Sequence, residues 1–302
     1  MSNKRGRVIS RTKGFYYLLT EQGEKVECKV KGQLFKDSQF DNQIAVGDIV
    51  RFSKPAAEKV GLISGIEERT SFLSRSRVGK EAEQIIAANI DYLLIVVSTQ
   101  QPSFRANLVN RMLVAAKVGN IIPVLVITKT DLSPDSNIEA LLRPYKNLGL
   151  KIILSSIFQN GISDELKRLL SNHVCLLAGQ SGVGKSSLLN LYFPGLSLRV
   201  KNVSEKTSKG AHTTTYARMY QIAENGFVID TPGIREFGLW NLTRANLDEF
   251  YPSFDSFIDL CKHRDCAHIH EPGCAVKQAV QAGYIHPGLY AGYIAIYDSL
   301  PA

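Results

Sequence analysis

Residues 179–186 constrain the fold of this chain more than any other segment, because they read Gly-Gln-Ser-Gly-Val-Gly-Lys-Ser. An apolar run precedes them at 174–178 and a helix-like run follows at 187–190, the strand, loop and helix order that a phosphate-binding loop requires. In such a loop backbone N–H groups cradle phosphates, the lysine reaches the outer phosphates and the serine offers an oxygen to Mg²⁺. Chance produces this pattern in roughly one chain of this length in a hundred.

The sequence therefore predicts a nucleoside triphosphate site at this loop. Lys185 is also a catalytic candidate, and Ser186 is a candidate Mg²⁺ ligand. The candidate contact residues are Gly179, Gln180, Ser181, Gly182, Val183, Gly184, Lys185, Ser186 and Ser187. A glycine-rich turn before a helix is the weaker alternative.

The composition is that of a soluble protein. The chain has 302 residues, 44% of them hydrophobic, which suggests two or three domains. No apolar run approaches the ~18 residues of a membrane span, and residues 1–7 lack the apolar core of a secretory signal. We expect a cytoplasmic monomer that does not bind membranes. Five cysteines, three of them at 261–274, favour a reducing compartment and a metal site over disulfides.

Positive charge is concentrated near the N-terminus. The net charge is +8, and residues 1–80 carry 16 Lys or Arg against 9 Asp or Glu. Such an excess favours a polyanionic partner bound through the N-terminal segment. A solvated basic face without a partner is the alternative, because charged runs are common and unspecific.

Residues 1–72 read as short strands separated by turns. Five such runs, with glycines between them, predict a small β-barrel of the OB-fold type; they lie at 6–10, 15–19, 25–30, 49–52 and 61–66. Lys13, Phe15, Tyr16 and Tyr17 place aromatic rings beside a cation, as in barrels that stack bases and hold phosphates. Because alternate residues also fill a barrel interior, at least one of these rings is expected in the core.

A polar, basic linker is expected at 73–89, and an α/β pattern follows it. Continuous apolar runs at 91–97 and 121–127, with helical periodicity between them, predict buried parallel strands and a crossover helix. Further strands are expected at 151–154, 173–178 and 227–230, and a helix at 164–170.

The strand at 121–127 ends in Thr128-Lys-Thr-Asp131. In guanine-nucleotide proteins an Asn-Lys-x-Asp loop reads the base, because its Asp accepts a ring N–H and an amine that adenine does not offer. Thr128 stands where Asn is usual, and Lys129 would lie along the base. Ser155 and Ser156 follow the next strand and could offer a backbone N–H to the guanine carbonyl. A capped helix start explains the four residues about equally well, but their place after a buried strand favours base recognition.

Asp230-Thr-Pro-Gly233 ends another strand. An Asp there can hold Mg²⁺ through water, and the N–H of Gly233 can sense the terminal phosphate. The polar segment 207–215 is a candidate switch loop in which Thr213 or Thr214 completes the Mg²⁺ shell, with an exposed edge or turn as the alternative. Base-reading segments precede phosphate-binding ones, the reverse of ordinary GTPases. Since all these loops lie at the carboxyl ends of parallel strands, the order predicts a circularly permuted GTPase.

Three cysteines and three histidines crowd residues 261–274. Three thiolates and one imidazole fit tetrahedral zinc with no position left for water, which predicts one structural Zn²⁺. Such a site supplies on the order of 10 kcal/mol toward folding a small segment. The candidate ligands are Cys261, Cys266, His268 and Cys274, with His263 and His270 as alternatives to His268. Reduced core cysteines are the competing interpretation.

The permuted order, the barrel and the Cys/His cluster together resemble the RsgA (YjeQ) family of GTPases that depend on the small ribosomal subunit. The similarity runs over nearly the whole chain and is most specific at 84–89, 210–215, 230–237 and 271–274. The resemblance implies hydrolysis of GTP to GDP with Mg²⁺, stimulated by the ribosome, coupled to late maturation of the small ribosomal subunit and contact with its rRNA. It also favours His268 as the zinc ligand.

The same resemblance assigns His212 to orient the attacking water. Ile234 stands where many GTPases keep a glutamine for that task, so we expect intrinsic turnover to be slow, on the order of 10⁻⁴ to 10⁻³ per second or below. A neutral imidazole can orient water near pH 7. A solvent-exposed loop histidine is the alternative.

The expected architecture is multidomain: an OB-fold β-barrel at 1–72, a linker at 73–89, a circularly permuted α/β P-loop GTPase domain at 90–238 and an α-helical zinc-binding domain at 239–302. Two other functions stay open. A P-loop kinase or ATPase would prefer ATP, whereas an RNA-binding assembly factor would use nucleotide only as a structural ligand.

Overall fold

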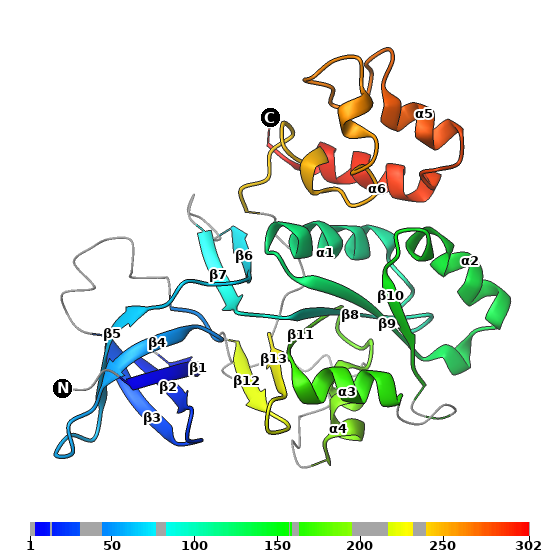
Figure 1. Cartoon of the computed structure of the whole chain (residues 1–302). Coiled ribbons are helices and arrows are strands. Elements are labelled where there is room, and N and C mark those ends of the chain that lie inside the picture. The colour runs from blue at the N-terminus through cyan, green and yellow to red at the C-terminus, as the bar shows by residue number, and fades with distance from the viewer. Residues whose placement is uncertain are drawn as a thin grey trace, which may run out of the picture.

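The computed structural model describes residues 4–12, 14–30, 44–76, 83–156, 158, 163–194, 217–231 and 240–301. Figure 1 shows three regions: a blue barrel, a cyan-to-yellow sheet with helices on both faces, and a compact orange and red region that lies over one of these helices. Within the described residues, no helix is long and apolar enough to cross a lipid bilayer.

The N-terminal barrel consists of β1 (Lys4–Thr12), β2 (Phe15–Thr20), β3 (Lys25–Val30), β4 (Ile49–Ser53) and β5 (Gly61–Ile66). It closes because β1 pairs with both β2 and β4, while β3 pairs with β5. Alternate residues such as Val8, Leu18 and Phe52 are fully buried inside. Tyr16 packs against this core, while the ammonium of Lys29 lies over the ring of Phe15. The predicted five-stranded barrel is confirmed.

A two-stranded hairpin follows the barrel in the segment where the sequence predicted a polar, basic linker. It pairs β6 (Phe72–Ser76) with β7 (Glu83–Ala88). The linker prediction missed it because charged and polar residues hide a buried face, to which Leu73 and Ala87 belong. The buried Asp48 carboxylate accepts two hydrogen bonds from Arg69, at 2.7 and 2.8 Å, and braces the junction between the barrel and this hairpin.

The central sheet is parallel except for its strand β12, as the apolar runs predict for the other strands. Its elements are β8 (Tyr92–Ser98), α1 (Ala106–Val118), β9 (Ile122–Thr128), α2 (Asp135–Lys146), β10 (Lys151–Leu154), α3 (Asp164–Asn172), β11 (Val174–Ala178), α4 (Lys185–Tyr192), β12 (Arg218–Gln221) and β13 (Phe227–Asp230). Helices α1 and α2 cover one face and α3 and α4 the other (Figure 1). The parallel strands run in the order β10-β9-β8-β11-β13, so their carboxyl ends form one edge.

The barrel and the central sheet form one hydrogen-bonded sheet of eleven strands. Antiparallel β12 joins them, because it pairs with β13 and also, at Arg218, with Ser10 of β1. The guanidinium of Arg7 lies over the ring of Phe227 at this junction. Short polar strands such as β12 carry little periodicity, so the sequence did not predict this continuity.

The C-terminal region contains η3 (Asp248–Phe250), η4 (Ile258–Leu260), α5 (Ala275–Gln281) and α6 (Pro287–Ser299). Helix α6 packs on α1 through Gly292, where a Cβ atom would lie 2.0 Å from Nδ2 of Asn110. Within the C-terminal region, Tyr251 donates a 2.5 Å hydrogen bond to the carbonyl oxygen of Leu289 in α6. The zinc candidates are therefore fixed to the helix between the first two parallel strands.

Candidate functional site

The phosphate-binding loop joins β11 to α4. Gly179 needs the absence of a side chain, because a Cβ would lie 2.0 Å from the carbonyl oxygen of Val96. Gly184 precedes the first turn of α4 with a φ of 97°, a conformation that costs glycine little. The Lys185 ammonium donates to the carbonyl oxygens of Gly179 and Gln180, at 2.7 and 2.8 Å. The loop thus curls around its own lysine.

Lys185 and Asp230 are both half-buried at the carboxyl edge of the sheet. Burial lowers the pKa of the Lys185 ammonium, and the charge of Asp230 opposes that shift. Burial likewise raises the pKa of Asp230, and Lys185 opposes it. The Ser186 hydroxyl and the Asp230 carboxylate are oxygen ligands of the kind that Mg²⁺ prefers. The donor set therefore fits a magnesium ion.

The base-reading candidates lie two strands away from the phosphate loop. Lys129 has a φ of 56° and leads into the short helix η1 (Thr130–Leu132). The Ser156 hydroxyl donates to Oδ1 of Asp131 at 2.6 Å. Ser155 and Ser156 are buried at the end of β10, where the backbone N–H of Ser155 donates to the carbonyl oxygen of Ile127. The Asp131 carboxylate is therefore positioned by the neighbouring strand.

Thr128 ties the two loops together. Its hydroxyl lies 2.6 Å from the carbonyl oxygen of Val183 and 3.1 Å from that of Val97. Val183 belongs to the phosphate loop and Val97 to β8, while Thr128 is only 6% exposed. A single buried hydroxyl thus connects the end of β9 to the phosphate loop, although the usual asparagine is absent.

Both loops line one cavity of about 290 Å³. The sequence-predicted residues in its wall are Thr128, Lys129, Asp131, Ser155, Val183, Gly184 and Ser187. Gly179, Gln180, Ser181, Gly182, Lys185 and Ser186 complete the phosphate loop, Ser156 lies behind Asp131, and Asp230 ends β13. The convergence of these segments, far apart along the chain, is what the permuted order predicted.

Four further residues line the cavity without having been predicted: Gln101, Leu132, Phe158 and Leu188. No motif marks them, because their place in the wall depends on the fold. Four predicted residues, His212, Thr213, Thr214 and Gly233, lie outside the described residues. Their roles stay predictions.

The metal candidates Cys261, Cys266, His268 and Cys274 come together with all ligand atoms within 4.8 Å of one another. Nδ1 of His268 lies 3.5 Å from the sulfurs of Cys261 and Cys274, which lie 4.0 Å from each other. Tetrahedral zinc with ordinary bond lengths needs separations of ~3.6 and ~3.8 Å. Burial raises the pKa of Cys266 to about 12, so metal binding would release its proton. The cluster fits a zinc ion.

A second layer of contacts orients these ligands. Nε2 of His268 lies 3.3 Å from Oδ2 of Asp248, which directs Nδ1 toward the cysteines. The Tyr290 and Tyr293 hydroxyls donate to the carbonyl oxygens of His268 and Ala267. Tyr293 is fully buried. Asp248 was missed, because it is twenty residues from His268 and belongs to no motif.

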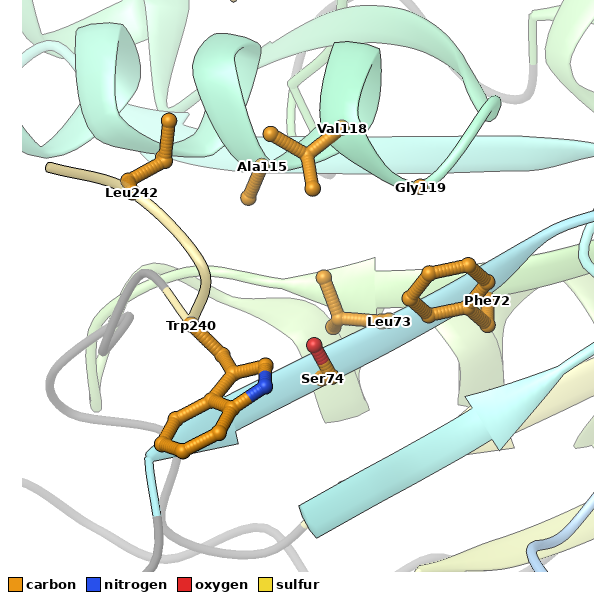
Figure 2. Close-up of a pocket in the computed structure, with 8 residues that line it drawn as sticks. All are labelled: Phe72, Leu73, Ser74, Ala115, Val118, Gly119, Trp240 and Leu242. Atoms are coloured by element: carbon orange, nitrogen blue, oxygen red, sulfur yellow. The ribbon is translucent and has the colours of Figure 1, made fainter. Parts of the chain in front are cut away.

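Trp240 and Leu242 line a small gap together with residues of α1 and β6. Figure 2 shows the indole of Trp240 beside Ser74 of β6, while Leu242 lies below α1. The gap between them measures only about 10 Å³, room for one water at most. It is a packing gap rather than a ligand site, and it lies where Trp240 and Leu242 meet α1 and the hairpin.

A parallel sheet whose base-reading loop precedes its phosphate loop, with both loops in one cavity, defines a circularly permuted P-loop GTPase. The sequence profile described as RsgA GTPase matches residues 66–240, and that described as RsgA N-terminal domain matches residues 5–63. The chain belongs to the RsgA GTPase family, a family of GTP-hydrolysing enzymes.

Relatives match over almost the full length. The small ribosomal subunit biogenesis GTPase RsgA of Chlorobaculum parvum is 41% identical, over 97% of each chain. The crystal structure of YjeQ from Thermotoga maritima superposes with a TM-score of 0.81 at 29% identity, over 99% of each chain. YloQ, described as a circularly permuted GTPase, superposes with a TM-score of 0.75 at 28% identity, over 100% of this chain and 97% of its own.

Proposed function

We propose that this protein hydrolyses GTP to GDP and phosphate during late maturation of the small ribosomal subunit, and that the subunit stimulates the reaction. The observation that carries the proposal is the cavity shared by Asp131 and the phosphate loop. A guanine nucleotide would contact both sides of this cavity, with its purine ring near Asp131 and its phosphates at the phosphate loop. The relatives named as small ribosomal subunit biogenesis GTPases support the partner.

The site residues would divide the work along the nucleotide. Asp131 would accept the N–H groups of guanine, and the carboxylate is already oriented by Ser156. Lys185 would exchange its two carbonyl partners for phosphate oxygens. Ser186 and Asp230 would hold Mg²⁺, which neutralises charge on the phosphates. Thr213 or Thr214 would complete its shell, and the N–H of Gly233 would meet the terminal phosphate.

The remaining parts would serve the ribosome. The basic N-terminal segment suits the phosphate backbone of rRNA, and one structural Zn²⁺ would hold the C-terminal region together. We propose domains at 1–72, 90–238 and 239–302, with 73–89 joining the first two, and a cytoplasmic monomer as the active form.

The direct test is GTP turnover with and without purified small ribosomal subunits. We expect slow turnover by the protein by itself and strong stimulation by subunits. His212→Ala should abolish the stimulation while GDP affinity stays within about twofold, because orienting water contributes about 10²- to 10⁴-fold to rate and little to ground-state binding. An unaltered stimulated rate would remove His212 from the mechanism. Lack of any stimulation would remove the partner.

The choice of base is tested by Asp131→Asn. This change should weaken GTP binding and improve binding of xanthosine triphosphate, because the amide can donate to the extra carbonyl of xanthine. Titration with GTP, xanthosine triphosphate and ATP measures the change. Preference of the unmodified protein for ATP would favour the kinase or ATPase alternative.

A further inference from the structure

Phe158 is the most exposed large apolar side chain in the described part of the structure, at 79%. It nevertheless lies in the wall of the nucleotide cavity with Leu132, which is 41% exposed. An exposed ring at the edge of a cavity loses favourable burial free energy that a planar ligand could restore.

The backbone of Phe158 is fixed relative to the base-reading carboxylate. Its N–H donates to the hydroxyl of Ser156 at 3.1 Å, and that hydroxyl donates to Asp131 at 2.6 Å. The ring therefore projects from a position only one hydrogen-bonded link away from the group that would contact the edge of the base.

We propose that the ring of Phe158 stacks on the face of the purine base. This contact would add affinity for any base, whereas the edge contacts of Asp131 would select guanine. The inference rests on the proposed binding of guanine nucleotide. A base bound through its edge still presents its π faces, and an aromatic side chain is a favourable partner for any of them. Leu132 adds apolar surface to the same wall, so base affinity and base choice come from different side chains.

Stacking has a signature that an effect on Asp131 does not have. Loss of an aromatic partner weakens any stacked base by about tenfold, whatever groups lie on the edge of that base. Inosine diphosphate differs from GDP only in lacking the exocyclic amine, whose N–H would donate a hydrogen bond to Asp131. Stacking predicts an equal loss for both nucleotides, whereas displacement of Asp131 predicts a larger loss for GDP.

The experiment measures the Kd of GDP and of inosine diphosphate by calorimetry for the full chain and its variants. Phe158→Ala should raise both values about tenfold with their ratio unchanged, and Phe158→Tyr should keep both within about twofold. Tyr284→Ala is the matched control, since Tyr284 is an aromatic residue of similar exposure, 75%, on the C-terminal region. It should change neither value.

Two results would overturn the proposal separately from the function. Unchanged GDP affinity in Phe158→Ala would show that the ring does not touch the base, and a changed ratio would show that it acts by positioning Asp131. If the unmodified protein bound neither nucleotide, the proposed function would fail and the stacking with it. Because Phe158 is exposed, its replacement leaves the core intact.

Discussion

The zinc cluster and the nucleotide cavity are built in opposite ways. The four metal candidates lie within residues 261–274, and their ligand atoms are within 4.8 Å of one another. The residues that line the cavity come from several segments between Gln101 and Leu188. The first site organises the segment that carries it, whereas the second exists only because a parallel sheet brings the ends of its strands together.

The two sites also differ in what stabilises the structure around them. The C-terminal region shares a hydrophobic core with α1 through residues such as Tyr293 and Ile296, and a bound zinc can supply on the order of 10 kcal/mol toward folding the segment that carries the cluster. Around the cavity, fully buried strand residues such as Leu94, Val96 and Val126 stabilise the sheet without any ligand. Loss of a ligand should therefore unfold one site and leave the other folded but empty.

Cys266→Ser should have the largest effect, because it removes a buried thiolate from the metal. We expect zinc stoichiometry to fall from one to nearly zero, with the loss of about 10 kcal/mol of metal-coupled folding in residues 240–301. Zinc analysis and hydrogen exchange of that region measure both. Treatment with a chelator should reproduce the effect.

Cys28→Ser provides the matched control, since Cys28 is a buried cysteine of the barrel outside the cluster. It should keep one zinc per chain. Absence of zinc from the unmodified protein would mean that the cluster is only a group of reduced core cysteines, and retention of zinc by Cys266→Ser would mean that Cys266 is not a ligand. Loss of GDP binding together with zinc would contradict the separation of the two sites.

Thr128→Val tests whether the cavity depends on its buried link. Valine keeps the shape but leaves the carbonyl oxygen of Val183 without its 2.6 Å partner. Leaving a buried acceptor unsatisfied costs about 2 kcal/mol, or roughly 30-fold in an equilibrium constant. Thermal unfolding and GDP titration measure the loss. Thr128→Ser retains the hydroxyl and should stay close to the unmodified protein, and equal behaviour of the two variants would show that the link is unimportant.

The sequence predicted elements and loops better than their connections. The barrel, the parallel strands and the helices at 106–118 and 164–172 follow from strong periodicity, and each parallel strand fixes where its loop lies. The hairpin at 72–88 was missed, because its charged residues mask a face of which Leu73 is part. The β1–β12 pairing joins strands more than 200 residues apart, and no local pattern encodes such a partner.

At the two sites, too, the sequence revealed the residues that belong to a local motif and not those that depend on tertiary structure. Motif residues such as Asp131 and Cys261 were identified because their chemistry dictates residue type and spacing. Thr128 departs from the motif, and its link to Val183 became visible only in three dimensions. The proposed roles of Phe158 and Asp248 rest on their positions, which depend on loop paths and tertiary packing rather than on a local sequence signal.

Asp248→Asn should have the smallest effect, because it alters a group that orients a ligand rather than a ligand. The Asp248 carboxylate accepts from Nε2 of His268 at 3.3 Å, and an asparagine oxygen can still accept, without the charge. Zinc affinity should fall by about tenfold, the lower end for such partners, while GDP affinity is unchanged. Competition with a metal indicator measures the zinc affinity. The control is Asp259→Asn, which changes an exposed acidic residue on η4 and should have no effect. An equal loss in both variants would mean that overall negative charge, rather than orientation of His268, governs zinc affinity.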